Sequence, residues 1–391
     1  MRKSVTFLLI VILSFSCFSA VAETSPFCTL DPELIGSPSF LLMEAETGEI
    51  IIERNADKQL PMASITKLMV LLIADEYINQ GKLALTDTVV GTPTAKETPG
   101  SRVYLDDGEE MSLETILKCI SIPSANDAAV ALAEHIAGSE EAFVKLMNQR
   151  AEKLGLKNTH YVTASGLDAE GHYSTARDIA TLSREIVLHH PLIMEHAATR
   201  NDTIRGGEFP LINTNNLLEN YEYATGLKTG TTENAGYCLT ATAEKDGVKL
   251  IAVILGADSS VQRFSEAKRL FEYAYSQFDM ITIHKKGPLK DEDGNTVYAT
   301  VSRGNKAKVP LRTDSDINAY IPAKYANKLK VEIKLNGTLT APIEEGTAVG
   351  KINIYADDIL VKSQDAVTAE KVKKMNIFQA FMHVVRAWLY F

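Results

Sequence analysis

The sequence predicts an α+β protein in which an antiparallel sheet covered by helices is followed by a small all-β domain and a C-terminal amphipathic helix. Three observations support this fold class. Stretches with strand character stand at both ends of residues 30–279, with helical segments between them. Residues 280–366 alternate apolar and polar positions over short distances, and residues 368–391 return to helical spacing. These patterns indicate one sheet assembled from both ends of the first domain.

The first domain opens with a predicted β-hairpin over residues 39–55. Segments with helical spacing follow, and several begin at Ser, Thr or Asp, as helix N-termini prefer. They span residues 64–79, 112–121, 125–137, 140–154 and 175–189. Strand patterns return over residues 236–243 and 248–257, around a turn at Asp246 and Gly247. A helix over residues 261–277 closes this domain.

Strands predicted over residues 296–302, 330–335 and 349–355, separated by Gly, Pro and Asp, define the all-β domain of residues 280–366. The helix of residues 368–391 carries a narrow polar stripe, and its strongly apolar part is too short to span a bilayer comfortably. We expect this helix to lie on a membrane surface, with Lys371, Lys373 and Lys374 near anionic lipid. The alternative is that this helix packs against another domain or against a second copy of the chain in a homodimer.

Residues 1–22 have the pattern of an export signal. Arg2 and Lys3 precede an apolar run over residues 7–18, and small residues follow at 20–22. This predicts a protein at the outer face of the cytoplasmic membrane, in a periplasm or cell-wall space. A lipid-modified Cys17 is the less favoured reading, because Phe15 and Ser16 are unusual neighbours for such a cysteine.

The whole-chain composition narrows the function. With 45% hydrophobic and 23% charged residues the chain has an ordinary globular composition, and its formal charge of −10 argues against nucleic-acid binding. Beyond the signal the cysteines are Cys28, Cys119 and Cys238, an odd number without metal-like clustering. We expect buried thiols, with a bridge between Cys119 and Cys238 left open.

Ser64 and Lys67 stand three positions apart in the stretch MASITKLM. On a helix these positions share a face, so the hydroxyl and the amine can touch. A serine hydroxyl becomes a useful nucleophile when a neighbouring base takes its proton. A lysine can be that base only when it is neutral, which requires burial or a nearby cation to lower its pKa. The pair therefore calls for a second cation.

An S-x-x-K pair alone carries little information, and Ser265 with Lys268 forms a second one, predicted to be solvated helix surface. The first pair is distinguished by two motifs that follow it in order. Residues 124–126 form the only S-x-N in the chain, and residues 228–230 the only K-T-G. Together the three motifs are typical of penicillin-recognising serine acyl enzymes.

On these motifs the sequence resembles the D-alanyl-D-alanine carboxypeptidases of the low-molecular-mass penicillin-binding proteins, from about residue 39 to the C-terminus. Residues 167–180, 212–218 and 224–243 resemble loops and strands of that family. The resemblance implies that residues 30–279 form a serine acyl-enzyme domain. This domain would remove the terminal D-alanine from peptidoglycan pentapeptide stems and be inhibited by β-lactams, without a metal or cofactor.

The resemblance also implies roles for single residues. Ser64 would be the nucleophile, Lys67 its base, Ser124 a proton relay and Asn126 the group that orients Lys67 and the substrate amide. Lys228 would be the second cation and, with Thr229, would bind the substrate carboxylate. The substrate-binding set is Lys228, Thr229, Gly230, Thr231 and Arg263. The backbone N–H groups of Ser64 and Thr231 would form the oxyanion hole. For Arg263 a structural ion pair is the alternative.

Two other functions stay open. A β-lactamase shares the three motifs, but no E-x-x-L-N stretch lies between Asn126 and Lys228. The other is a non-catalytic penicillin-binding or wall-sensing protein, because Ser165 and Thr231 depart from the usual family pattern.

Other polar residues are predicted to be structural. No H-E-x-x-H motif accompanies the histidines, so no metal is expected. The residues concerned are His189, His190 and His196, together with Asp168, His172 and Asp178.

Overall fold

A computed structural model describes residues 24–291 and 293–389; the predicted export signal of residues 1–22, with Cys17, lies outside the described residues. The first domain is built on a five-stranded antiparallel sheet in the order β2-β1-β9-β8-β7. Its strands are β1 (Ser39–Glu44), β2 (Ile50–Arg54), β7 (Ala224–Thr232), β8 (Gly236–Lys245) and β9 (Val248–Ala257). The two ends of the domain therefore meet in one sheet, as the sequence predicts.

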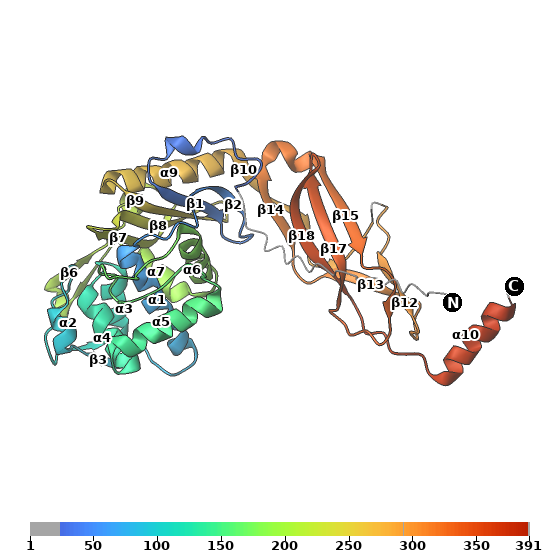
Figure 1. Ribbon diagram of the computed structural model, residues 1–391, viewed down its shortest axis with the longest axis horizontal. Coiled ribbons are helices and arrows are strands. Elements are labelled where there is room, and N and C mark those ends of the chain that lie inside the picture. The colour runs from blue at the N-terminus through green and yellow to red at the C-terminus, as the bar shows by residue number, and fades with distance from the viewer. Residues whose placement is uncertain (1–23, 292, 390–391) are drawn as a thin grey trace, which may run out of the picture.

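Both faces of this sheet are covered, as Figure 1 shows. Leu41 and Met43 of β1 pack into the core shared with the helical layer. Phe40 and Leu42, which alternate with them, pack into the core under α9 (Ser260–Gln277). A strand buried on both faces reads as a continuous apolar run, because every side chain reaches a core.

The helical layer surrounds α1 (Lys67–Asn79), whose first nine residues are all buried. Its other helices are α2 (Pro93–Glu97), α3 (Leu113–Ser121), α4 (Asn126–Ala137), α5 (Glu140–Leu154), α6 (Ala176–His189), α7 (Pro191–Ala198) and α8 (Leu217–Asn220). Ser112, Ser139, Thr175 and Ser259 each accept a hydrogen bond from a backbone N–H of the first helical turn that follows. These caps explain why α3, α5, α6 and α9 begin close to where the sequence predicts.

Shorter elements complete the first domain. Two small two-stranded sheets pair β3 (Thr88–Val90) with β4 (Glu110–Ser112), and β5 (Asn201–Ile204) with β6 (Phe209–Ile212). Short 3-10 segments are η1 (Pro32–Leu34), η2 (Ala63–Thr66) and η3 (Arg205–Gly207). The predicted helix of residues 64–79 thus begins with the tighter 3-10 turn η2 and becomes α-helical at Lys67.

The second domain is all-β with its own core, which confirms the predicted fold class. β10 (Phe278–His284) pairs with β14 (Ile317–Pro322), and a larger sheet has the order β15-β17-β18-β13-β12-β16, with β11 beside β13. Its strands are β11 (Gly287–Pro288), β12 (Tyr298–Ser302), β13 (Lys308–Thr313), β15 (Leu329–Leu335), β16 (Leu339–Thr340), β17 (Ala348–Ala356) and β18 (Ile359–Thr368). The short segment η4 (Ala323–Lys328) follows β14.

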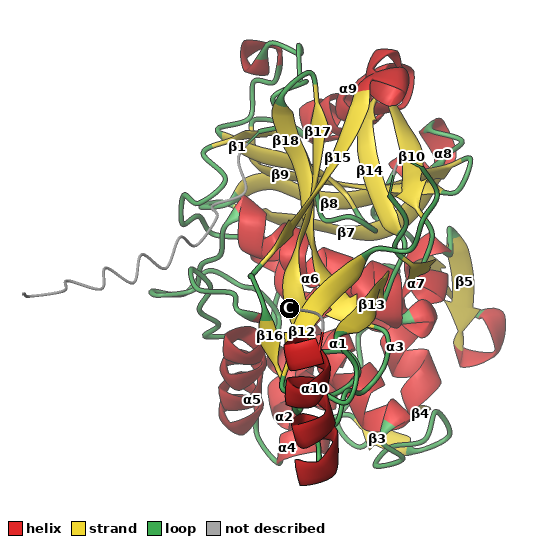
Figure 2. Cartoon of the chain, turned by 90° about the vertical axis from the view of Figure 1, so that its right-hand side faces the viewer, coloured by secondary structure: helices red, strands yellow, loops and turns green. Residues whose placement is uncertain are grey.

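The helix α10 (Ile377–Leu389) begins later than the predicted start at residue 368, because Val372 and Lys374 instead form β-bridges to the second domain and Lys371 pairs with Glu344. It lies at the end of the second domain away from the first (Figure 1). Figure 2 views the molecule from this end, with the second domain in front of the first. Ile377, Phe378 and Phe381 are 92%, 71% and 63% exposed. Within the described ranges, no helix combines the length and the apolar character needed to cross a membrane.

Candidate active site

The turn η2 presents Ser64 at the base of α1. Ala63, immediately before it, has φ +49°, a left-handed conformation that non-glycine residues rarely adopt. The chain then enters α1 at Lys67, whose Nζ lies 2.9 Å from Ser64 Oγ. The three-residue spacing thus brings the hydroxyl and the amine into contact, although the turn between them is 3-10.

Lys67 is fully buried and has two further partners. Its Nζ donates to Asn126 Oδ1 at 2.6 Å and to the carbonyl oxygen of Ser165 at 2.5 Å. Burial holds the pKa of Lys67 well below its ordinary value, and the nearby charge of Lys228 lowers it further, while Asp127 acts in the opposite direction. The lowering effects dominate, so the site favours the neutral amine that a base requires.

The S-x-N motif of residues 124–126 lies beside Lys67 and contributes a second set of polar groups to the site. Asn126 is the first residue of α4, and its Nδ2 donates to the carbonyl oxygen of Pro99 at 2.6 Å. That bond directs its Oδ1 toward Lys67. Ser124 has φ +67°, and its buried Oγ has no hydrogen-bond partner among the described residues. Strained backbone and unsatisfied buried hydroxyl groups occur mainly at sites that bind or react with a ligand. Ser124 has both features.

The K-T-G motif lies on β7, against the nucleophile turn. A Cβ at Gly230 would stand 2.7 Å from the carbonyl oxygen of Met62 and 3.1 Å from the backbone nitrogen of Ser64. Only glycine allows this approach. Lys228 is buried, and its pKa is lowered to about 7, first by burial and then by the charge of Arg263.

The remaining predicted residues surround this strand. Thr229 Oγ1 lies 2.6 Å from Thr214 Oγ1. Arg263, on α9, donates from Nη1 to the carbonyl oxygen of Gly230 and to Thr231 Oγ1, both at 3.0 Å. Within the described part of the chain it has no acidic partner, so its hydrogen bonds do not have the form of the alternative structural ion pair. Its position braces the backbone beside the site.

Sequence reasoning did not identify the loop of residues 160–174 as part of this site. The carbonyl oxygen of Ser165 accepts from Lys67, and Asp168 accepts from Thr232 Oγ1 at 2.7 Å beyond the K-T-G motif. His172 is buried with its Nε2 2.8 Å from Thr66 Oγ1. Ser165 stands out in the sequence only as a departure from the usual family pattern, because a contact made by a backbone carbonyl does not depend on the residue type.

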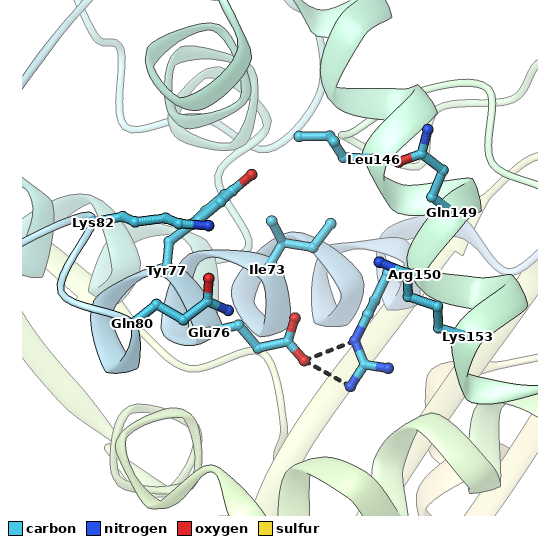
Figure 3. A pocket seen from close by; sticks show the side chains of 9 residues that line it. All are labelled: Ile73, Glu76, Tyr77, Gln80, Lys82, Leu146, Gln149, Arg150 and Lys153. Carbon is cyan, nitrogen blue, oxygen red and sulfur yellow. Dashed lines mark hydrogen bonds and ion pairs between the residues drawn. The ribbon is translucent and has the colours of Figure 1, made fainter.

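A separate polar cluster lies at the far end of α1, beside the cleft of Figure 3. Possible metal-ligand atoms of Glu76, Glu185 and His190 lie within 4.8 Å of one another. The Arg150 guanidinium, however, contacts Glu76 at 2.6 Å and Glu185 at 3.1 Å, and His190 Nδ1 lies 2.5 Å from Asp75. We interpret this cluster as a structural ion-pair network.

The three cysteines of the described ranges form no disulfide bridge. Cys28, Cys119 and Cys238 are free thiols, and the last two are buried. Burial raises the pKa of the Cys238 thiol to about 11.

Comparison with known proteins places the chain in a family. Residues 27–259 match the family described as D-alanyl-D-alanine carboxypeptidase, and residues 278–374 match the C-terminal domain of penicillin-binding protein 5. D-alanyl-D-alanine carboxypeptidase DacF of Bacillus subtilis is 34% identical over 360 residues, covering 90% of each chain.

Two solved structures show the same likeness. Penicillin-binding protein 5 of Haemophilus influenzae is 29% identical with a TM-score of 0.82, covering 88% of this chain and 100% of that one. Penicillin-binding protein D2 of Listeria monocytogenes, solved in an ampicillin-bound form, is 32% identical with a TM-score of 0.57, covering 62% of this chain and 98% of that one.

Proposed function

We propose, from the premise that the chain belongs to the D-alanyl-D-alanine carboxypeptidase family, that Ser64 is the nucleophile of a serine carboxypeptidase acting on peptidoglycan stems. The supporting observation is a buried amine, Lys67, held 2.9 Å from Ser64 Oγ with a depressed pKa. Such an amine can accept the hydroxyl proton as the oxygen attacks. The reaction class follows from the family, and the residue roles are our assignment.

In the first half of the reaction, Ser64 Oγ attacks the carbonyl carbon between the two terminal D-alanines and Lys67 takes its proton. The developing oxyanion accepts from the backbone N–H groups of Ser64 and Thr231, a contribution of ~3 kcal/mol in comparable sites. The close approach of Gly230 to Ser64 supports this pairing. The proton passes through Ser124 to the departing nitrogen, and D-alanine leaves as a free amino acid.

In the second half, water attacks the carbonyl carbon of the acyl-enzyme and gives a proton to Lys67. Lys67 then returns a proton to Ser64 Oγ as the acyl bond breaks. The shortened peptide leaves with a new carboxylate. The substrate carboxylate is held by Lys228 and Thr229, with Arg263 near the same strand. Asn126 Oδ1 keeps Lys67 oriented throughout.

The test is release of D-alanine from diacetyl-Lys-D-Ala-D-Ala by the purified protein. Ser64→Ala should lower the rate by ~1,000-fold or more, because no other group in the site replaces the nucleophile. Ser265→Ala is the matched control, since that hydroxyl belongs to the second S-x-x-K pair and donates to Gln262 on an exposed part of α9. If Ser64→Ala retained wild-type release, the proposal would be wrong.

We also propose that β-lactams acylate Ser64 and leave slowly. The ampicillin-bound form of the Listeria monocytogenes relative supports this. Rapid turnover of nitrocefin in place of a long-lived adduct would favour the β-lactamase alternative. A burst of labelled penicillin without any peptide hydrolysis would favour a non-catalytic penicillin-binding protein.

The cellular site is a further proposal. Residues 1–22 would direct export, and α10 would hold the enzyme at the outer face of the cytoplasmic membrane. The exposure of Ile377, Phe378 and Phe381 on α10 supports a membrane-surface role. Peptidoglycan stems lie outside the cytoplasm, in agreement with this placement.

A further inference from the structure

His172 connects the loop of residues 160–174 to the nucleophile turn through a buried chain of hydrogen bonds. Its side chain is only 6% exposed. On one side Nδ1 accepts from the backbone N–H of Val162 at 3.0 Å. On the other side Nε2 lies 2.8 Å from Thr66 Oγ1, which in turn donates to the carbonyl oxygen of Ala63 at 2.8 Å.

The donors and acceptors fix the proton positions in this chain. Because Nδ1 faces a backbone N–H, it must be unprotonated, so the ring proton lies on Nε2. That N–H donates to Thr66 Oγ1, and the threonine hydroxyl is then free to donate to Ala63. Only the neutral Nε2–H tautomer of His172 satisfies every member of the chain.

The surroundings of His172 keep the ring neutral. Burial lowers its pKa to about 4, and the charges of His160 and Lys67 act in the same direction, while Asp168 opposes them. The rings of His172 and the buried Tyr161 also pack edge to face, with their centroids 6.0 Å apart. The ring therefore stays neutral, and the chain of hydrogen bonds intact, at pH values well above about 4.

The far end of this chain reaches the residue before the nucleophile. Ala63 holds the left-handed φ that aims Ser64, and its carbonyl oxygen is the group that Thr66 fixes. The loop touches the same carbonyl, because a Cβ at Gly166 would stand 2.2 Å from it. The next residue back, Ser165, supplies the carbonyl oxygen that accepts from Lys67.

We propose that His172 is a positioning residue for acyl transfer: through Thr66 it fastens the loop to the nucleophile turn, so that the Ser165 carbonyl and the Ser64 hydroxyl reach Lys67 together. Among the described residues, the ring of His172 makes hydrogen bonds to Thr66 and to its own loop and none to Ser64 or Lys67. This inference rests on the proposed roles of Ser64 and Lys67. It predicts a loss in the acylation step rather than in binding.

The test measures acylation by a fluorescent penicillin over a range of concentrations, which separates the binding constant from the rate of the chemical step. His172→Phe keeps the ring volume without its hydrogen bonds and should slow acylation by about tenfold or more with little change in binding. Thr66→Val should have a similar effect. Because the two residues act in one chain, the double variant should be no slower than the slower single variant.

His160→Phe is the matched control. His160 lies on the same loop but is exposed, and its Nδ1 contacts only the backbone of Gly171 at 2.8 Å. This variant should acylate at the wild-type rate. Additive losses in the double variant, or a folded His172→Phe with unchanged acylation, would overturn the proposal.

Two measurements keep the test decisive if His172→Phe fails to fold. Thr66→Val probes the same chain from its other end. In the wild-type protein, NMR of ¹⁵N-labelled histidines should show one of the eight rings as a neutral Nε2–H tautomer at about pH 6, and that signal should be absent in His172→Gln. A charged ring or an Nδ1–H tautomer at His172 would contradict the proposal without reference to Ser64.

The proposed function has a separate test. Labelling by the fluorescent penicillin that persisted in Ser64→Ala would contradict the role of Ser64 and leave the assignment of His172 to the NMR result.

Discussion

The side-chain nitrogen of Lys67 donates to the carbonyl oxygen of Ser165 at 2.5 Å, although 98 residues separate them in the sequence. Asn126 Oδ1 is a second partner of the same nitrogen. Both oxygens are acceptors only, so they take the two N–H groups of a neutral amine and leave its lone pair directed at Ser64. The base is therefore oriented by its acceptors as well as made neutral by its burial.

A permanently charged side chain in place of Lys67 should abolish acylation. Arginine remains protonated under all working conditions, so Lys67→Arg cannot accept the Ser64 proton, and we expect acylation by penicillin to fall by ~1,000-fold or more. Lys268→Arg is the control from the second S-x-x-K pair, where the lysine is 44% exposed and faces Glu272. Wild-type acylation by Lys67→Arg would show that another group acts as the base.

The pH dependence of peptide hydrolysis should report both lysines. Catalysis requires Lys67 without its proton and Lys228 with one, to bind the substrate carboxylate. Activity should rise as Lys67 deprotonates, and KM should increase as pH passes the Lys228 pKa of about 7. A substrate with an amidated C-terminus offers no carboxylate, so its KM should not change across this interval. A KM for the acid substrate that stays constant to about pH 9 would contradict the assignment of Lys228.

The sequence predicts the elements whose signals are local. The hairpin of β1 and β2 follows from a glycine turn between apolar runs, and helices such as α5 and α6 follow from a capping residue before an amphipathic stretch. The order of the three motifs predicts residues that the fold brings to one site. The small two-stranded sheets that contain β3 and β5 are not predicted, because three or four residues give no clear periodicity.

The missed parts of the site have a common physical cause. Ser165 acts through its backbone carbonyl, and His172 through a tautomer set by an amide on the same loop. Neither function depends on a spacing that can be read along the chain. Gly230 shows the same limit, since its need for a missing Cβ is visible only once β7 lies against η2.

The contact between the two domains should weaken as pH rises. Glu49, at the end of the β1–β2 turn, accepts from the backbone N–H of Tyr320 at 2.9 Å. Burial raises the pKa of Glu49 to about 7, with Glu44 acting in the same direction and Tyr320 and Lys362 opposing it. A folded-state pKa above the unfolded value means that the stabilisation is fully present below about pH 4.5 and is lost as pH rises through about 7.

Glu49→Gln should remove this dependence, because the amide stays neutral. The measurement is the difference in thermal unfolding midpoint between about pH 5 and about pH 8.5, which should be smaller in Glu49→Gln than in the wild type. Glu46→Gln is the control, since Glu46 accepts from Asn318 at the same contact but is exposed. Identical pH dependence in Glu49→Gln and the wild type would assign the effect to other groups.

The final prediction concerns α10, whose exposed apolar side chains we expect to be covered by a membrane surface. Transfer of a phenylalanine side chain out of water contributes about 2 kcal/mol, so replacing both Phe378 and Phe381 by serine should weaken binding to anionic vesicles by about tenfold or more. A control variant replaces two exposed apolar residues of the second domain, Val331 and Leu360, and should bind like the wild type. Removing residues 377–391, which leaves the buried Val372 in the second domain, should abolish the binding. If vesicle binding were unchanged while a concentration-dependent dimer disappeared from the phenylalanine variant, α10 would instead pack against a second copy of the chain.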